Sequence, residues 1–169
     1  MSFDDADLSL FQEMTVKALE AEVAPSYEGW EEAGLVDRQL WNKLGDAGLL
    51  GASASEMFGG AGAPASVTFM IIYEMSRLNF GGFSSSFNIH SNIVMPYIDR
   101  LGTDDQKNKW LPKMVTGEAV GALAMTEPGA GSDVAGIRTT AKKDGDGWLL
   151  NGSKIFITNG IHADLIIVA

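Results

Sequence analysis

At Gly117-Glu118-Ala119-Val120-Gly121-Ala122-Leu123-Ala124-Met125 the hydrophobic pattern of the chain changes its period. Upstream, apolar residues recur at the three- and four-residue spacing of amphipathic helices. Downstream they alternate, as in a strand with one buried face. We therefore expect an α+β protein with two units. Residues 1–118 should form an all-α N-terminal helical domain, and residues 119–169 should begin a β domain with antiparallel strands.

The first helices of the helical unit can be placed from their apolar faces and their end signals. The opening helix carries an apolar stripe from Phe11 onward, and Pro25 should end or kink it. A second helix is expected from the N-cap Asp37 to Gly48. Residues 67–75 are apolar nearly all round, which predicts a central helix buried on several sides.

Two further helices close the unit. One is expected through residues 88–98, with Pro96 as a kink because proline removes a backbone donor. The other opens with Thr103 and Gln106, which have the spacing of a capping box, and stops at Gly117.

The β unit is predicted to contain several short strands. They should cover residues 119–125, 139–143, 148–150 and 154–158, with hairpin turns at Asp144-Gly145-Asp146-Gly147 and at Asn151-Gly152. Residues 165–169 form one more apolar strand that has no obvious partner. Because so few strands make a poor closed sheet, we expect further sequence to complete it and the chain to be truncated.

Composition excludes several classes of function. The 169 residues include 12 basic and 22 acidic side chains, giving a net charge of −10, and no cysteine. This charge disfavours nucleic acid and anionic lipid as partners. The missing cysteines exclude a disulfide scaffold, a thiolate metal site and a cysteine nucleophile. No apolar run is long enough to span a membrane and the first residues are acidic, so we expect a cytoplasmic protein.

Individual residues of the sequence give little indication of a catalytic or metal site. His90 and His162 are the only histidines, and neither belongs to a spaced set of ligands, so no metal site is predicted. Glu74 lies inside the apolar helix and needs a partner. A salt bridge to a neighbouring basic residue is favoured there over a catalytic base.

The first informative stretch is Ala124-Met125-Thr126-Glu127-Pro128-Gly129-Ala130-Gly131-Ser132-Asp133, a glycine-rich loop directly after a strand. Glycine lets backbone N–H groups approach an anionic or polar ligand closely. The loop is not a dinucleotide fingerprint, because Val134 stands where that motif requires glycine, and it lacks the lysine of a P-loop. The residues alone leave open a ligand-binding loop and a structural turn.

The second informative stretch is Leu150-Asn151-Gly152-Ser153-Lys154-Ile155-Phe156-Ile157-Thr158-Asn159-Gly160, a turn that runs into an alternating segment. In a strand, Phe156 and Thr158 would share a face. An aromatic platform beside a hydroxyl could stack on a flat ring and hydrogen-bond its edge, although a bare Phe-x-Thr is more often only a strand.

Together the two stretches resemble signatures of the acyl-CoA dehydrogenase family. Residues 126–133 look like its first signature, and residues 151–160 look like the flavin-facing segment that follows 25 residues later. The resemblance implies a β-barrel-like middle domain after the helices. It also implies an FAD enzyme that removes hydrogens from Cα and Cβ of an acyl-CoA thioester, giving a trans-2-enoyl-CoA while hydride passes to flavin. An electron-transfer acceptor protein and a homo-oligomer, dimer or tetramer, are the implied partners.

The resemblance also assigns residues by position. Thr126 would lie at the ring edge, Thr158 within reach of flavin N5, and Ser132 near the pyrophosphate and the CoA, where it would also bind substrate. The implied cofactor-binding residues are Leu123, Ala124, Met125, Thr126, Glu127, Pro128, Gly129, Ala130, Gly131, Ser132, Phe156, Ile157 and Thr158. The small residues 81–86 would help to shape an acyl tunnel.

Two departures from the family pattern matter. Many members have tryptophan where Phe156 stands, a change that keeps the stacking surface and loses the indole N–H. The C-terminal helical bundle, which supplies the glutamate base, is absent, and neither Glu74 nor Glu127 matches that base. No catalytic residue is therefore expected in this chain.

Other functions remain open at this point. The same fold carries acyl-CoA oxidases and flavin monooxygenases, which these motifs do not distinguish from dehydrogenases. An alternative from another class is a non-catalytic, half-length paralogue that binds a partner chain or an acyl-CoA.

Overall fold

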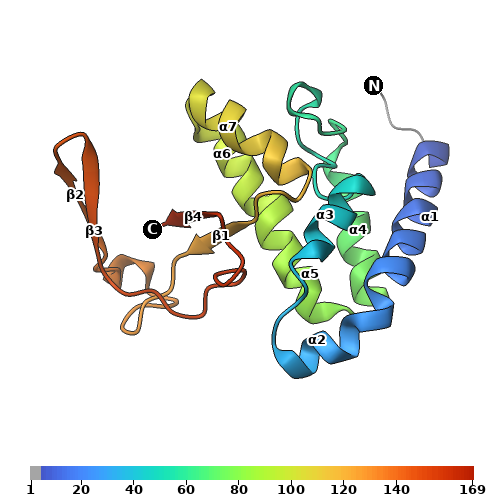
Figure 1. Ribbon diagram of the computed structural model, residues 1–169, viewed down its shortest axis with the longest axis horizontal. Coiled ribbons are helices and arrows are strands. Elements are labelled where there is room, and N and C mark those ends of the chain that lie inside the picture. Colours follow the sequence, from blue (N-terminus) through green and yellow to red (C-terminus); the bar gives the residue numbers. More distant parts are fainter. Residues whose placement is uncertain (1–4) are drawn as a thin grey trace.

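The computed structural model describes residues 5–169, in which a group of helices is followed by two small sheets (Figure 1). The helices are α1 (Asp5–Glu22), α2 (Tyr27–Ala33), α3 (Gln39–Asp46), α4 (Ala65–Arg77), α5 (Gly81–Phe87), the π-helix η3 (Asn88–Val94), α6 (Met95–Leu101) and α7 (Asp104–Val115). The strands are β1 (Gly121–Ala124), β2 (Thr140–Asp144), β3 (Gly147–Asn151) and β4 (Leu165–Val168). The predicted α+β class is confirmed.

The predicted end signals of the helices lie at or next to the observed helix ends. Thr103 and Gln106 form the capping box of α7, each side chain accepting a hydrogen bond from the other residue's backbone N–H. The Asp37 carboxylate accepts the N–H of Gln39, but the N-cap of α3 is Arg38, one residue later than predicted. Pro25 lies in a short 3₁₀ turn, η1 (Ala24–Ser26), which separates α1 from α2.

The helix predicted over residues 88–98 belongs to a longer helical run. α5, η3 and α6 follow one another without a break from Gly81 to Leu101, and Pro96 lies at the start of α6, directly after the π-helical segment, where it offers no N–H to the helical hydrogen bonds. The π-helical segment buries His90, Ser91 and Val94. This segment therefore faces the interior of the molecule where the helices meet β1.

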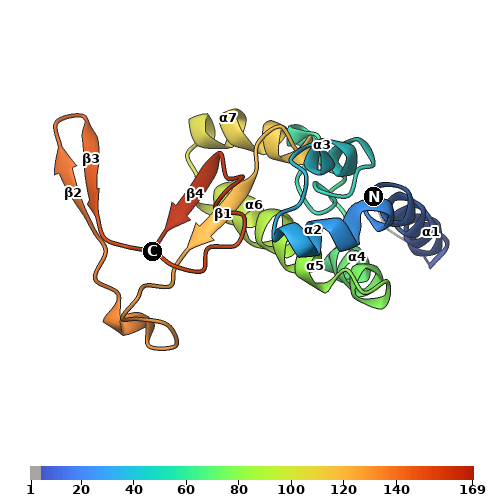
Figure 2. The same cartoon turned by 60° about the horizontal axis from the view of Figure 1, so that its bottom comes forward.

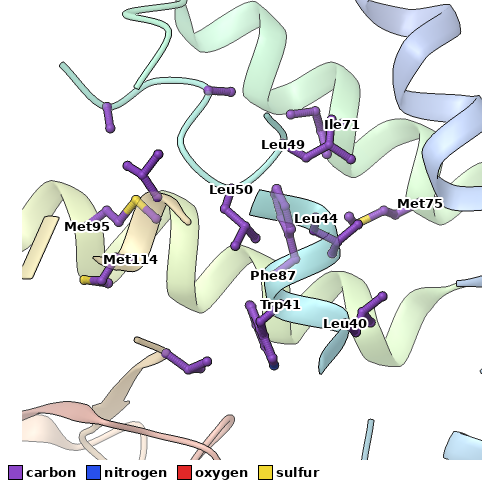
Figure 3. Packing of buried hydrophobic residues seen from close by; sticks show 14 of the residues in the cluster. Leu40, Trp41, Leu44, Leu49, Leu50, Ile71, Met75, Phe87, Met95 and Met114 are labelled. Carbon is purple, nitrogen blue, oxygen red and sulfur yellow. The ribbon is translucent and has the colours of Figure 1, made fainter. Parts of the chain in front are cut away.

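The core lies between α3, α4, the α5–α6 run and α7. Trp41 of α3 is wholly buried and packs its ring edge against Phe83, with 5.8 Å between ring centroids. Figure 3 shows Leu44, Leu50 and Phe87 in the centre of this cluster, Trp41 below them, and Met95 beside Met114 further to the left. This cluster fixes the helical unit on which the β segments rest.

α4 is less buried than its sequence predicts. Phe69 and Tyr73 are 73% and 62% exposed, so only one face of the helix packs into the core. The prediction for Glu74 is confirmed: its carboxylate accepts hydrogen bonds from Gln12 Nε2 and, at 2.7 Å, from Arg77 Nε. Burial alone would raise the pKa of Glu74, but these two hydrogen bonds lower it overall.

The strands form two separate pairs. β2 and β3 make the predicted antiparallel hairpin, which turns at residues 144–147 and stands away from the helices (Figure 2). β1 and β4 pair in parallel, with Gly121 opposite Leu165 and Ala124 opposite Val168. The expectation of an entirely antiparallel β unit is therefore wrong, and residues 165–168 have a partner after all.

The strand predicted at residues 154–158 does not form. Phe156 and Asn159 adopt left-handed backbone conformations, with φ of +57° and +66°, which interrupt an extended pleat. Asn151-Gly152 consequently ends β3 and is not a hairpin turn. Phe156 and Thr158 do not share a strand face.

Arg38 and Asp164 join the helical unit to the β1–β4 pair. The Arg38 guanidinium donates to the carbonyls of Gly117 and Glu118 and forms a 2.8 Å salt bridge with Asp164. The Asp164 carboxylate also accepts the N–H of Val120. These contacts hold the entry to β1 and the entry to β4 side by side.

Candidate functional site

The glycine-rich loop after β1 is organised around the carboxylate of Glu127. This carboxylate accepts hydrogen bonds from the N–H of Arg138, the N–H and hydroxyl of Thr139, and Nζ of Lys154. Glu127 and Ala130 also exchange backbone hydrogen bonds across a tight turn. The Thr139 hydroxyl, followed by the Lys154 ammonium and the Arg138 N–H, lowers the pKa of Glu127 to about 2. The carboxylate is therefore ionised at neutral pH and engaged in structure.

Lys154 connects the two stretches that the sequence singles out. Its Nζ lies 2.9 Å from Oε1 of Glu127 and 3.0 Å from the carbonyl oxygen of Met125. One residue further, the N–H of Ile155 donates to the carbonyl of Thr126. Residues 125–127 and 154–155 therefore form one unit, although no regular strand pairs them.

The tip of the loop is open. Pro128, Gly129, Gly131 and Ser132 are exposed. A Cβ atom added to Gly129 or to Gly131 would meet nothing within 4 Å, and neither glycine has a positive φ. The fold itself does not require glycine at these two positions. Because glycine has no side chain, the backbone N–H groups at these positions are accessible to a ligand that approaches closely.

The predicted contact residues fall into different environments. Ala124 is buried and Leu123 packs against the core, whereas Met125 and Phe156 are exposed. Phe156 is 89% exposed with a left-handed backbone, which is an uncommon combination for a bulky residue. Ile157 and Thr158 are partly buried.

A cleft of about 490 Å³ lies between α2, α5 and residues 157–162. Ile157 and Thr158 line one side, while Gly82 and Ser86 from the small-residue segment 81–86 line the other. Tyr27 also lines the cleft, and its hydroxyl donates to Glu31 and accepts the N–H of Gly82. Gly81 and Ser85 do not line this cleft. The structure thus brings part of the segment 81–86 and two of the predicted contact residues to one cavity.

Sequence reasoning missed the residues that support this site. Lys154 and Thr139 hold the Glu127 carboxylate, and Asn159 donates from Nδ2 to the carbonyls of Ser86 and Gly121. Lys154 and Asn159 stand inside the second quoted stretch, so that stretch carried the signal. Thr139 lies outside both stretches, and its contact depends on the path of the intervening chain.

Within residues 5–169, no three His, Cys, Asp or Glu side chains gather closely enough to hold a metal ion. No helix in the same range combines the length and apolar character needed to cross a membrane.

Two family models match the chain in sequence. The N-terminal domain of acyl-CoA dehydrogenases matches residues 5–118, and the middle domain matches residues 122–169. The chain belongs to the acyl-CoA dehydrogenase family. The resemblance of the two quoted stretches to that family is therefore confirmed.

Individual members of the acyl-CoA dehydrogenase family are similar over nearly the whole chain. The mitochondrial long-chain specific acyl-CoA dehydrogenase of Rattus norvegicus is 48% identical over 159 residues, covering 94% of this chain and 36% of that protein. The crystal structure of an acyl-CoA dehydrogenase from Geobacillus kaustophilus has a TM-score of 0.93 and 47% identity, covering 99% of this chain and 43% of that one.

A third acyl-CoA dehydrogenase relative carries a cofactor. The glutaryl-CoA dehydrogenase of Mycobacterium smegmatis, in complex with FADH2, has a TM-score of 0.90 and 34% identity, covering 98% of this chain and 42% of that one. The chain thus spans well under half the length of these relatives. Because the rat relative is mitochondrial, the cytoplasmic location stays a prediction.

Proposed function

We propose that this chain is the N-terminal portion of an FAD-dependent acyl-CoA dehydrogenase, which converts an acyl-CoA thioester to a trans-2-enoyl-CoA. The observation that carries the proposal is the coupling of the two family stretches through Lys154, beside a cleft lined by Thr158 and Ser86. An exposed glycine loop and a cavity that both adjoin residues 154–162 suit a flat cofactor and a long acyl chain.

The residues present fit the cofactor. Gly129 and Gly131 offer bare backbone that the fold does not need, next to the exposed hydroxyl residue Ser132. Phe156 has a left-handed backbone, and its exposed ring has no packing role within the described residues. We propose that residues 123–132 hold the flavin edge and its phosphates, and that residues 156–158 lie against the ring system. Bound FAD would supply the hydride acceptor.

The proposed reaction also requires a catalytic base from the protein. In the proposed reaction a base removes a proton from Cα, a hydride leaves Cβ, and a double bond forms between the two carbons. Neither buried carboxylate of this chain suits the role of base, since Glu74 and Glu127 are both ionised and held by several donors. We therefore propose that the base lies on sequence outside these residues, as do an oligomer interface and a docking site for an electron-acceptor protein.

A first experiment isolates the polypeptide containing these residues from its source and records its intact mass and visible spectrum. The proposal expects a mass well above 18.0 kDa and flavin bands that bleach when an acyl-CoA is added without oxygen. Flavin that does not respond to any acyl-CoA would contradict a dehydrogenase. Binding of acyl-CoA by a protein without flavin would favour the non-catalytic paralogue.

A second experiment tests the site itself in the same polypeptide. Thr158→Val keeps the shape of the side chain and removes the hydroxyl, which should slow flavin reduction by acyl-CoA by about tenfold or more. Thr68→Val, at a partly buried position of α4 that does not line the cleft, makes the same chemical change and should leave the rate unchanged. Equal rates in the two variants would remove Thr158 from the site.

A further inference from the structure

Both backbone polar groups of Gly121, at the start of β1, are hydrogen-bonded by side chains. Its N–H donates to Nδ1 of His90 at 3.0 Å, and its carbonyl accepts Nδ2 of Asn159 at 3.1 Å. The carbonyl of the preceding residue, Val120, accepts N–H groups at the start of β4. Successive strand residues direct their backbone groups to opposite sides. His90 and Asn159 therefore occupy the edge of β1 that β4 does not cover.

His90 can fill this role because it is buried and held in one tautomer. The ring is inaccessible to solvent and packs on Trp41, with 5.0 Å between ring centroids. Since Nδ1 accepts the N–H of Gly121, the proton must be on Nε2, which donates to the carbonyl of Met114 at 3.0 Å. One neutral imidazole thus connects the end of α7 to the start of β1.

Asn159 makes the complementary connection. Its Nδ2 donates to the carbonyl of Ser86 on α5 as well as to Gly121, and its φ of +66° is one that asparagine tolerates better than most residues. The residue directly follows Thr158. The helical run from α5 to η3 therefore supplies both a carbonyl, at Ser86, and an imidazole, at His90, to the same junction.

Side chains of the helical unit pack tightly against Gly121. A Cβ atom at Gly121 would lie 2.7 Å from Cγ1 of Val94 and 2.8 Å from Cε of Met114. The strand thus packs against these two side chains at a distance that leaves no room for a Cβ atom, and both backbone polar groups of Gly121 need partners there.

We propose that His90 and Asn159 are positioning residues which bind the N–H and the carbonyl of Gly121 at one edge of β1 and thereby set residues 123–132 and 156–158 relative to each other. This inference rests on the proposed function, because those two segments are the candidate flavin contacts. His90 acts on the first segment through β1, and Asn159 acts on the second as its direct neighbour. Displacing the junction would change the distance between the two segments without removing any of their residues.

The first test separates the Gly121 hydrogen bond from general packing. His90→Asn retains an acceptor near Nδ1, whereas His90→Gln retains a donor near Nε2, and both lose the ring. Amide hydrogen exchange is measured by NMR on the 169-residue chain, with Leu111 in α7 as the reference for global opening. We expect Gly121 to exchange at least about tenfold faster in the Gln variant than in the Asn variant, relative to Leu111. Equal ratios would overturn the inference.

The second test examines Asn159 with a matched control. Asn159→Gly and Asn79→Gly both relax a left-handed asparagine, but only the first removes hydrogen bonds to Gly121 and Ser86. We expect the amide resonances of Gly121 and Thr158 to shift in Asn159→Gly and to stay in place in Asn79→Gly. Unchanged resonances in both variants would overturn the role of Asn159.

The third test uses the flavin-containing polypeptide. His90→Gln should shift the visible flavin band and weaken FAD binding by about tenfold, and His90→Asn should restore part of the affinity. If the polypeptide contains no flavin, the proposed function fails while the exchange measurements still decide the geometry of the junction. If flavin is present and both variants keep its band and affinity, the positioning role is wrong and the proposed function stands.

Discussion

Nζ of Lys154 lies 2.9 Å from Oε1 of Glu127, and the two side chains are only 11% and 8% exposed. This nearly buried ion pair connects the glycine-rich loop to the segment that precedes Phe156. Removing one member would leave the other charge without its partner in a site from which water is largely excluded. The pair is therefore expected to matter more for stability than the surface ion pairs of the same chain.

Lys154→Met should lower the Tm by about 5 °C or more, because it removes the ammonium and leaves the Glu127 carboxylate with an unpaired charge. Lys43→Met is the matched control, since Lys43 forms an exposed 2.8 Å salt bridge with Glu22. Its Tm should change by about 2 °C at most. Thermal unfolding followed by circular dichroism checks both. Similar shifts in the two variants would show that the Lys154 pair behaves as a surface pair.

Acid should loosen the glycine-rich loop through Glu127. The folded-state pKa of about 2 lies below the ordinary value of 4.5, so ionised Glu127 contributes full stability above pH 4.5 and loses it as the pH falls toward 2. Glu127→Gln should be less stable than the wild type at neutral pH, and the difference should shrink across this acid window. Urea unfolding at several pH values measures it. A difference that is independent of pH would contradict the lowered pKa.

His90 should act in a different pH window. Burial, reinforced by the positive charge of Arg38, lowers the pKa of His90 to about 4 from 6.5, although its bond to Met114 opposes the shift. The other groups packed on the ring, Trp41 and the Gly121 peptide, do not titrate. Between pH 6.5 and 4, His90 binds a proton in the unfolded chain but stays neutral in the folded chain. Stability should therefore fall by about 2 kcal/mol as the pH drops through this range.

His90→Asn removes the titrating group and should flatten the pH dependence between 6.5 and 4. Urea unfolding of the wild type and the variant at matched pH values is the measurement. If both proteins lose the same stability over that range, His90 is not the group responsible.

Replacing either of two glycines in short helices by alanine should change the free energy of unfolding, in opposite directions for the two positions. A Cβ at Gly45 of α3 would collide with the backbone carbonyl group of Thr116, whereas a Cβ at Gly29 of α2 would meet nothing within 4 Å. Gly45→Ala should destabilise the chain by about 1–3 kcal/mol, since α3 or the end of α7 must shift. Gly29→Ala should stabilise it by about 0.5–1 kcal/mol by reducing the freedom of the unfolded chain. The denaturant midpoints of the two variants and the wild type measure these changes. Stabilisation by Gly45→Ala would contradict the packing described for α3.

Local chemistry in the sequence predicted the helical unit well. The capping box of Thr103 and Gln106 and the partner of Glu74 depend on residues within a few positions of each other, and both predictions are confirmed. The burial of α4 was overestimated. An apolar sequence does not reveal whether another element covers each face, and Phe69 and Tyr73 lie on an open one.

Distant contacts in the β unit were harder to predict. Alternation at residues 154–158 cannot show that Phe156 takes a left-handed backbone, and the parallel pairing of β1 with β4 joins residues 44 positions apart. In the candidate site, the family stretches contained Lys154 and Asn159. The partners of Asn159, Gly121 and Ser86, could not be predicted from the sequence, because they depend on the three-dimensional path of the chain.

The isolated β2–β3 hairpin has a spectroscopic consequence. Every residue of both strands is exposed, including Trp148 at 67%, while Trp41 is wholly enclosed by the helices. Trp41 and Trp148, two of the chain's four tryptophans, should therefore emit at different wavelengths and respond to different events. Emission from Trp41 would follow cooperative melting of the helical core. A blue shift confined to Trp148 would mark another surface closing over the hairpin while that core stays unchanged.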